Sequence, residues 1–269
     1  MAFNDTRKGS SSAEKMVWSS SRSEAQYQRS LLQRLDETMR SVAIVFIGTN
    51  RYLDFLPSYY EQCDELLMPD CKKQYFVFTD GDLEGTPEDV SVYNIEHKPW
   101  PSITLERFHT ILEAEEELKS YDWLLFLDAD MRVNKKIFSN EILDPEKDFV
   151  AVHHPCHYDD YSGTFETNPA STACVPDQEK AYYQGCLWGG KVSAVIPMMK
   201  ELKKRVDTDY SNDIIALWHD ESHLNKFFSE NKDRVNDLSP DYAFPECFPQ
   251  YPYDRKIIHL AKNNSEYQT

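Results

Sequence analysis

An α/β fold with a mainly parallel sheet is predicted by three apolar runs that alternate with helical stretches. The runs cover residues 42–47, 75–78 and 123–127, and each one ends in polar residues. Apolar residues at helical spacing indicate helices between them, around 53–67 and 102–118. Because this alternation is typical of a parallel sheet with crossover helices, we expect the three runs to form one sheet.

The polar residues after these runs predict where a ligand binds. Gly48 and Thr49 follow the first run, Asp80 follows the second, and Asp128 and Asp130 follow the third. In open α/β sheets, ligands bind outside the carboxyl ends of the strands. We therefore expect these side chains to lie at one edge of the sheet, around a common ligand.

Residues outside this core are of two kinds. We expect residues 1–40 to be a polar arm that ends in a helix over 23–39, since 1–22 are Ser-rich and apolar periodicity begins only after them. Residues 153–180 have loop character, and 182–190 lead into a helix predicted over 193–206. A Pro- and aromatic-rich tail begins at Leu238.

Charge and composition exclude several classes of partner. The formal net charge of −17 argues against nucleic acids and anionic membrane surfaces, whose phosphates repel such a protein. No apolar stretch reaches the roughly 18 residues of a membrane span, and no secretory signal is found at the amino terminus. Six cysteines without zinc-site spacing indicate reduced thiols. We therefore expect a soluble cytoplasmic protein with no transmembrane segment.

The segment LWHDESHLNKFF at 217–228 places a polar cluster at the start of a helix. Apolar residues at 224, 227 and 228 indicate a buried helix face. The four polar residues before it are His219, Asp220, Glu221 and Ser222, directly after Trp218. One interpretation is a functional site; the alternative is an ordinary helix start, with Asp220 as N-cap and Glu221 complementing the helix dipole.

The acidic triplet at 128–130 is the second candidate site. Two carboxylates two residues apart, on a turn that leaves a strand, can share a hard divalent cation. Oxygen ligands suit Mg²⁺ or Mn²⁺ rather than zinc. Since the triplets at 80–82 and 207–209 have the same spacing, the spacing alone does not identify the site.

A series of motifs resembles the retaining glycosyltransferases of family 6, which include the blood-group A and B transferases and α1,3-galactosyltransferase. In order they are FIGTNRY at 46–52, VFTD at 77–80, WPSITLERF at 100–108, LDADM at 127–131, HP at 154–155, TFE at 164–166, YYQGCLWGG at 182–190, WHDESHLNK at 218–226, LSP at 238–240 and KN at 262–263. WHDESHLNK is nearly identical to the catalytic segment of the family, and the order of the motifs agrees throughout.

The resemblance implies a GT-A fold with a Rossmann-like sheet in one domain, residues 41–269. About 42–135 would form the nucleotide-binding half, and 136–269 the half for the donor sugar and the acceptor. Segment 182–190 would be the donor-sugar loop. The residues implied to bind the donor are Ile47, Gly48, Thr49, Tyr52, Arg107, Asp128, Ala129, Asp130, Gln184, Gly185, Cys186, Asp220 and Lys262.

The same resemblance assigns roles to the charged residues. Asp128 and Asp130 would hold Mn²⁺, with Mg²⁺ as an alternative, on the diphosphate of a UDP-sugar. Glu221 would lie beneath the anomeric carbon, either as a covalent nucleophile or as an electrostatic stabiliser. The residues implied to contact the acceptor are His154, Thr164, Trp218, His219 and Glu246. Without the resemblance, the favoured interpretation of Arg107 and Lys262 is that both are solvated surface cations.

The implied reaction is transfer of galactose or N-acetylgalactosamine from UDP to a sugar hydroxyl, forming an α1,3 linkage on a β-galactoside. Cys186 favours galactose, because a small Gly at this position goes with N-acetylgalactosamine in several relatives. Animal relatives begin with a membrane anchor, whereas many bacterial ones lack the acidic pair; this chain resembles a short bacterial or viral member that keeps it. Two alternatives remain: a phosphatase of the haloacid dehalogenase type, although Arg132 stands where Thr or Val is usual, and a non-catalytic nucleotide- or glycan-binding module.

Overall fold

The computed structural model describes residues 39–160, 162–177, 179, 181–248 and 254–267, together with Tyr27. The chain divides into two compact units, Met1–Met39 and Arg40–Thr269, and every element below belongs to the second. The arm predicted over 1–22 and most of the helix predicted over 23–39 therefore lie outside the described residues. Among the described residues, no helix has the length and apolar character that a membrane span needs. The expected cytoplasmic location stays a prediction.

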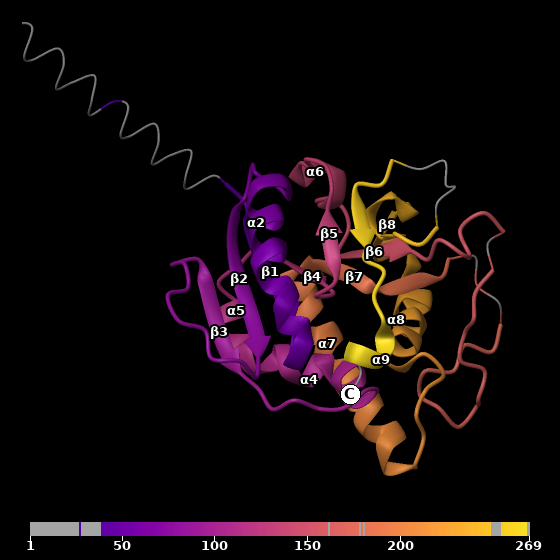
Figure 1. The fold of residues 1–269 in the computed structure, drawn as a ribbon. Helices are drawn as coiled ribbons and strands as arrows, with labels where there is room; N and C mark the ends of the chain where they lie inside the picture. Colours follow the sequence, from indigo (N-terminus) through magenta and orange to yellow (C-terminus); the bar gives the residue numbers. More distant parts are fainter. Residues whose placement is uncertain are drawn as a thin grey trace, which may run out of the picture. The chain divides into compact units, whose positions relative to one another are not determined.

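A seven-stranded sheet forms the centre of this unit, in the order β3-β2-β1-β4-β7-β6-β8 (Figure 1). Only β7 runs antiparallel to its neighbours, so the sheet is mostly parallel, as predicted. Its strands are β1 (Ser41–Ile47), β2 (Lys72–Thr79), β3 (Val90–Asn94), β4 (Trp123–Leu127), β6 (Phe149–His153), β7 (Tyr183–Lys191) and β8 (Val235–Leu238). The three apolar runs are β1, β2 and β4, and they are neighbours, which confirms the prediction.

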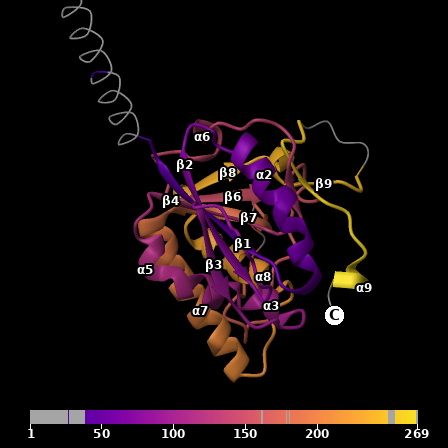
Figure 2. The same ribbon diagram turned by 60° about the vertical axis from the view of Figure 1, so that its left-hand side comes forward.

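The strand at the centre of the sheet, β4, is apolar along its whole length because helices cover both faces of the sheet. All five residues of β4, WLLFL, are buried. One face packs against α2, and the other against α4, α5, α7 and α8 (Figures 1 and 2). The helices are η1 (Asn50–Phe55), α2 (Leu56–Leu66), α3 (Ser102–Leu105), α4 (Arg107–Ile111), η2 (Leu112–Ala114), α5 (Glu115–Leu118), α6 (Ser139–Ile142), α7 (Val192–Ser211), α8 (His219–Glu230), η3 (Lys232–Arg234), η4 (Pro240–Tyr242) and α9 (Asn264–Tyr267).

Two predicted segments differ from the structure. The stretch predicted as one helix over 102–118 is four short helical pieces, and the first interruption, at Glu106, comes directly before Arg107. The segment 182–190, expected to be a loop, is mainly the internal strand β7. Its glycines are needed there, since a Cβ on Gly189 would lie 2.1 Å from the backbone oxygen of Leu124 on β4. The described part of 153–180 is loop, as expected, except for His153, which ends strand β6.

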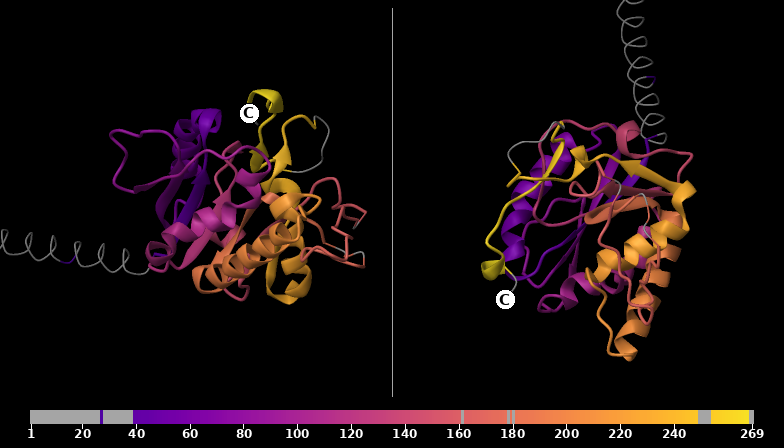
Figure 3. Two further views of the ribbon diagram at one scale, coloured as in Figure 1. Left: turned by 90° about the horizontal axis from the view of Figure 1, so that it is seen from below. Right: turned by 90° about the vertical axis from the view of Figure 1, so that its right-hand side faces the viewer.

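A small second sheet, in the order β5-β10-β9, brings the C-terminal tail back to the acidic triplet. Its strands are β5 (Met131–Val133), β9 (Phe244–Pro245) and β10 (Ile257–His259). In the antiparallel pair of β10 and β5, His259 lies opposite Met131. The tail then continues to α9, which lies beside η1 (Figures 1 and 3).

Candidate active site

The acidic triplet 128–130 connects β4 to β5, and backbone hydrogen bonds fix it from two sides. The amide of Asp128 donates to the carbonyl of Cys186 on β7 at 2.9 Å, and the amide of Leu260 donates to the carbonyl of Asp130 at 2.9 Å. Asp130 is only 2% exposed. This triplet therefore lies between β7 and the C-terminal tail.

The other two triplets have different surroundings. Asp80 is exposed and accepts a hydrogen bond from the backbone amide of Asn50. Asp209 is buried against the Ser171 hydroxyl and the Thr172 amide. In the described part of the chain, the one group of at least three His, Cys, Asp or Glu side chains that could hold a metal ion is Asp128, Asp130 and His259. The tertiary structure thus separates the three triplets, which spacing alone could not.

His259 was missed by the sequence reasoning. Its Nε2 lies 3.1 Å from Oδ2 of Asp130, and Nδ1 faces Nε2 of Gln184 at 3.3 Å. Lys262 also forms an ion pair with Oδ2 of Asp130. Burial alone would raise the pKa of Asp130, but His259 and Lys262 hold it below its usual value. The only signal in the sequence was a His three residues before a Lys already singled out.

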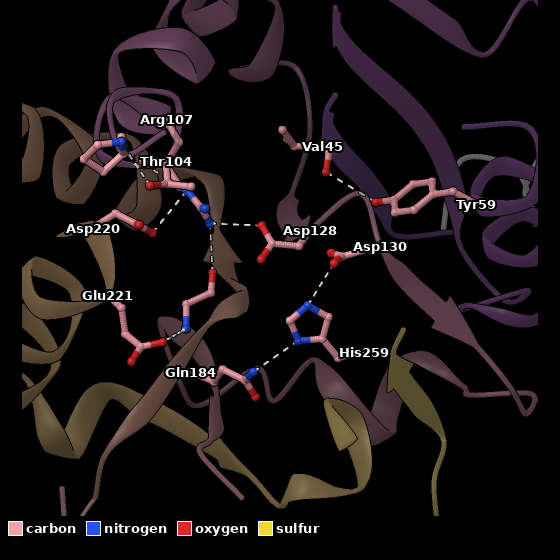
Figure 4. Close-up of polar contacts among 12 residues, drawn as sticks. Val45, Tyr59, Thr104, Arg107, Asp128, Asp130, Gln184, Asp220, Glu221 and His259 are labelled. Atoms are coloured by element: carbon pink, nitrogen blue, oxygen red, sulfur yellow. Dashed lines mark hydrogen bonds and ion pairs between the residues drawn. The ribbon is translucent and has the colours of Figure 1, made fainter. Parts of the chain in front are cut away.

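Arg107 connects the two acidic groups (Figure 4). Its Nη1 lies 3.2 Å from Oδ1 of Asp128, and its Nε lies 3.1 Å from Oδ2 of Asp220. The Nη1 group also donates to the carbonyl of Gly185 at 3.0 Å. The guanidinium is almost fully buried, at 6% exposure of the residue, so it is not a solvated surface cation.

The carboxylates in the first turn of α8 face other elements instead of capping their own helix: Asp220 faces Arg107 on α4, and Glu221 faces Tyr182 and β7. Oε1 of Glu221 accepts a hydrogen bond from the Tyr182 hydroxyl at 2.7 Å, and Oε2 accepts one from the Gly185 amide at 2.8 Å. The N-cap residue is Trp218, and no side chain caps the helix. The alternative in which Asp220 is the N-cap is therefore wrong. His219 adopts a positive φ of 53°, a conformation that is uncommon for a residue other than glycine.

Burial leaves the two carboxylates in the first turn of α8, Asp220 and Glu221, easier to protonate than usual. Burial raises the pKa of Asp220 to about 7, against the opposing effect of Arg107, and it also raises the pKa of Glu221. The Nε–H of Arg107 donates to the carbonyl of Thr104. Oδ2 of Asp220 is consequently left without a hydrogen bond from any described residue, although it is buried. It is an acceptor available to a ligand.

Two adjoining pockets meet at these residues. The first is lined by Ile47, Thr49, Tyr52, His97, Lys98, Trp100, Ile103, Thr104, Arg107, Phe126, Asp128, Ala129, Asp130, His259, Lys262 and Tyr267. The second is lined by Trp100, Thr104, Arg107, Asp128, Gln184, Gly185, Cys186, Trp218, His219, Asp220, Glu221 and His259. Their shared wall includes Arg107, Asp128 and His259.

Comparison with known proteins assigns this arrangement to a family. The sequence profile of glycosyltransferase family 6 matches residues 17–269, nearly the whole chain. The chain belongs to glycosyltransferase family 6. It is therefore a hexosyltransferase with a GT-A fold, which confirms the resemblance and rules out the phosphatase and non-catalytic alternatives.

Three relatives illustrate the range of the match. The O-antigen biosynthesis glycosyltransferase WbnI of Escherichia coli is 30% identical over 231 residues, which cover 84% of this chain and 97% of that protein. Human globoside alpha-1,3-N-acetylgalactosaminyltransferase 1 is 30% identical over 252 residues, covering 89% of this chain and 71% of that protein. Rat histo-blood group ABO system transferase 2 is 29% identical over 233 residues, which cover 82% of this chain and 68% of that protein.

Most of the residues that the family resemblance singled out line one of the two pockets. Gly48 does not, and is buried beneath the ring of Phe46. His154 is held behind the site, with its ring 5.8 Å from that of Tyr182, and burial lowers its pKa to about 4. Thr164 is exposed and interacts with the Tyr182 hydroxyl. An acceptor role for His154 or Thr164 stays a prediction.

Glu246 also lines neither pocket. Its carboxylate accepts hydrogen bonds from Nη2 of Arg132 at 3.2 Å and from the Ala261 amide at 3.0 Å. It therefore braces the tail that carries His259 and Lys262. Its predicted acceptor contact is not tested by this arrangement.

Tyr267, in α9, is a second residue missed by the sequence reasoning. Its ring stacks on Phe55 at 5.5 Å and meets Tyr52 edge-on at 5.2 Å. Arg51 and Glu266 form an ion pair at 2.7 Å beside it. These contacts hold the tail against η1, so that Tyr267 becomes part of the wall of the first pocket.

The charges around the pockets fit a divalent cation. Among the described residues that line the two pockets, four carboxylates, Asp128, Asp130, Asp220 and Glu221, face two permanently charged cations, Arg107 and Lys262, together with His259. Lys98, also in the first pocket, is paired with Glu106 at 2.5 Å. When all four carboxylates are ionised and His259 is neutral, two negative charges remain uncompensated, which a divalent cation would neutralise.

Proposed function

We propose that this family 6 enzyme transfers galactose or N-acetylgalactosamine from a UDP-sugar to a sugar hydroxyl, with retention of configuration and with Mn²⁺ at Asp128 and Asp130. The acceptor is a β-galactoside, and the linkage is α1,3. One observation carries the proposal: Arg107 joins the acidic triplet, in the first pocket, to the Asp220 and Glu221 pair, in the second. Nucleotide and hexose would thus meet at Arg107.

The first pocket suits a nucleoside diphosphate. Apolar and aromatic side chains at its inner end, Ile47 and Tyr52, offer a surface for a base, and Thr49 offers a hydroxyl. Lys262 lies 5.2 Å from the Tyr52 ring and supplies positive charge for the diphosphate. A divalent cation held by Asp128 and Asp130 would offset the charge that develops on the departing diphosphate.

The second pocket suits a hexose. Oδ2 of Asp220 is buried and pairs with Arg107 but receives no hydrogen bond from any described residue; it would accept one from a sugar hydroxyl, which also compensates for its burial. Glu221 would face the anomeric carbon and stabilise positive charge there, with its position fixed by Tyr182 and Gly185. The exposed indoles of Trp100 and Trp218, each 48% exposed, offer apolar surfaces on which an acceptor sugar can stack.

The choice between the two donors depends on Cys186, which lies 2% exposed at the floor of the second pocket. A side chain larger than that of the Gly found here in several relatives would leave less space for an N-acetyl group, which favours UDP-galactose. The measurement is UDP release from UDP-galactose, UDP-N-acetylgalactosamine, UDP-glucose and UDP-N-acetylglucosamine, with Mn²⁺ or EDTA, without acceptor and with simple β-galactosides.

We expect Mn²⁺-dependent release from UDP-galactose, accelerated by a β-galactoside, and a product with an α-anomeric NMR signal. Equal release in EDTA would contradict the metal requirement. Preference for UDP-N-acetylgalactosamine would contradict the role given to Cys186, and no acceleration by any β-galactoside would contradict the acceptor.

A further inference from the structure

We propose that His259 is the third protein ligand of the divalent cation, through Nε2, and that the Gln184 amide oxygen accepts a hydrogen bond from Nδ1. This inference rests on the proposed function, because it requires the cation at Asp128 and Asp130. Neither the acidic triplet nor the motifs of the sequence point to His259. Only the tertiary structure brings its ring close to Asp128 and Asp130.

The backbone places His259 rigidly. His259 lies opposite Met131 in the β10–β5 pair, and Met131 directly follows Asp130 in the chain. The amide of Leu260, the residue after His259, donates to the carbonyl of Asp130. One ligand atom from each of Asp128, Asp130 and His259 lies within 4.8 Å of the others. Three such atoms, contributed by two strand ends, can bind one ion without a rearrangement of the backbone.

The surroundings of the ring contain an unsatisfied group that the proposal explains. Oε1 of Gln184 is buried and has no hydrogen-bond partner among the described residues, while Nε2 of the same amide faces Nδ1 of His259. A half-turn of this amide exchanges its oxygen and nitrogen, which have nearly the same shape. The oxygen then accepts the Nδ1–H bond, and the lone pair of Nε2 is free for a metal.

This is the arrangement that metal-bound histidines usually have, with the second ring nitrogen donating to an oxygen that fixes the tautomer. An imidazole ligand also changes the expected choice of ion. Mg²⁺ prefers oxygen ligands only, whereas imidazole is a good ligand for transition metals. His259 would therefore favour Mn²⁺ over Mg²⁺.

Lys262 competes for the same site. Its ammonium forms an ion pair with Oδ2 of Asp130, the oxygen that His259 also faces. A cation bound by Asp130 would displace this ammonium, which stays in the first pocket beside Tyr52. Metal binding would thus release a positive charge where the diphosphate is expected.

The test is pulsed electron paramagnetic resonance of Mn²⁺ bound to the full-length protein without an affinity tag, with and without UDP. We expect modulation from a directly bound ¹⁴N nucleus in the wild type. His259→Gln should lose this modulation and bind Mn²⁺ at least about 10-fold more weakly, with a smaller preference for Mn²⁺ over Mg²⁺. His109→Gln is the matched control, because His109 pairs with Asp207 and lines neither pocket.

Gln184→Leu provides a second variant that leaves the ligand atoms in place. It should keep the ¹⁴N modulation and weaken Mn²⁺ binding, since Nδ1 loses its partner. If the wild type binds Mn²⁺ without ¹⁴N modulation, the inference about His259 is wrong and the proposed function stands. If the wild type binds no Mn²⁺, even with UDP, both are wrong.

Discussion

Glu221 has a carboxylate that is buried and held at both oxygens. The Tyr182 hydroxyl and the Gly185 amide each donate to one oxygen, and both bonds favour the ionised form, although burial has the larger effect and raises the pKa of the group. In its ionised form the group is an anion in a place where water is largely excluded. Such an anion stabilises a developing positive charge much more than a solvated one would.

Replacing Glu221 by Gln keeps the shape and removes the charge. We expect kcat to fall by about 100-fold or more, because the stabilisation of the anomeric carbon is lost. The affinity for UDP with Mn²⁺ should stay within about 3-fold of the wild type, since Glu221 lines only the second pocket. Single-turnover transfer and calorimetry of UDP binding measure the two quantities. A variant with near wild-type turnover would remove Glu221 from the catalytic role.

Asp220 should reduce stability as the pH rises. Its pKa is about 7 in the folded protein, above the value near 4 of an unfolded Asp, so the folded state binds more protons between these pH values. The free energy of unfolding therefore falls with rising pH through this window and is level again above pH 7. The Asn side chain of the Asp220→Asn variant cannot titrate, so this variant does not lose stability through this pH window.

Urea unfolding at pH 5, 6, 7 and 8 in EDTA measures the difference between wild type and Asp220→Asn. We expect the variant to gain about 2 kcal/mol relative to the wild type between pH 5 and pH 8. The variant should at the same time lose transferase activity, because it lacks the carboxylate that is proposed to bind a sugar hydroxyl. Gain of stability with loss of activity is the usual result when a buried functional charge is removed. A difference in stability that does not change with pH would contradict the raised pKa.

At the scale of the element, β7 shows what sequence patterns could predict and what they could not. The runs of β1, β2 and β4 are apolar throughout because they lie between two helical layers, so their pattern is visible locally. The segment of β7 contains Gly185, Gly189 and Gly190, which resemble loop residues. Their need for glycine arises from the close approach of β4, β6 and α8, which no local pattern records.

Local sequence patterns were also insufficient for the C-terminal tail, which carries His259, Lys262 and Tyr267. Sequence motifs identified Lys262 and the acidic triplet separately. The role of His259 depends on the pairing of β10 with β5, two strands far apart in the chain, and Tyr267 depends on α9 meeting η1. Conversely, WHDESHLNK could be identified without the structure, since its residues are adjacent in sequence and share one helix start.

Gly185 gives a direct test of the packing between β7 and α8. A Cβ at this position would lie 3.3 Å from both Oδ2 of Asp220 and Cβ of Glu221, so both residues would have to shift slightly. We expect Gly185→Ala to lower kcat about 100-fold through misplacement of the two carboxylates. The melting temperature should change little, because the backbone of Gly185 has no positive φ. Activity close to that of the wild type would show that the site tolerates the displacement.

For the whole molecule, the net charge of −17 repels a negatively charged donor, so binding of such a donor requires positive charge at the site. The acidic triplet makes this problem more severe, since Asp128 and Asp130 face the place where the diphosphate is expected. A divalent cation resolves both conflicts. It follows that UDP and Mn²⁺ should bind cooperatively, and that each should bind weakly without the other.

Thermal unfolding of the EDTA-treated protein tests this coupling. With Mn²⁺ and UDP each at about 100 times its dissociation constant, UDP should add about 2.7 kcal/mol of stability, which corresponds to roughly 5–10 °C in Tm for a domain of this size. UDP alone should add almost nothing. Asp128→Asn should abolish the effect of Mn²⁺, whereas Asp82→Asn, in the exposed triplet 80–82, should not. Equal stabilisation by UDP in EDTA would mean that Arg107 and Lys262 suffice to hold the diphosphate, and that the two acidic residues serve to orient these cations.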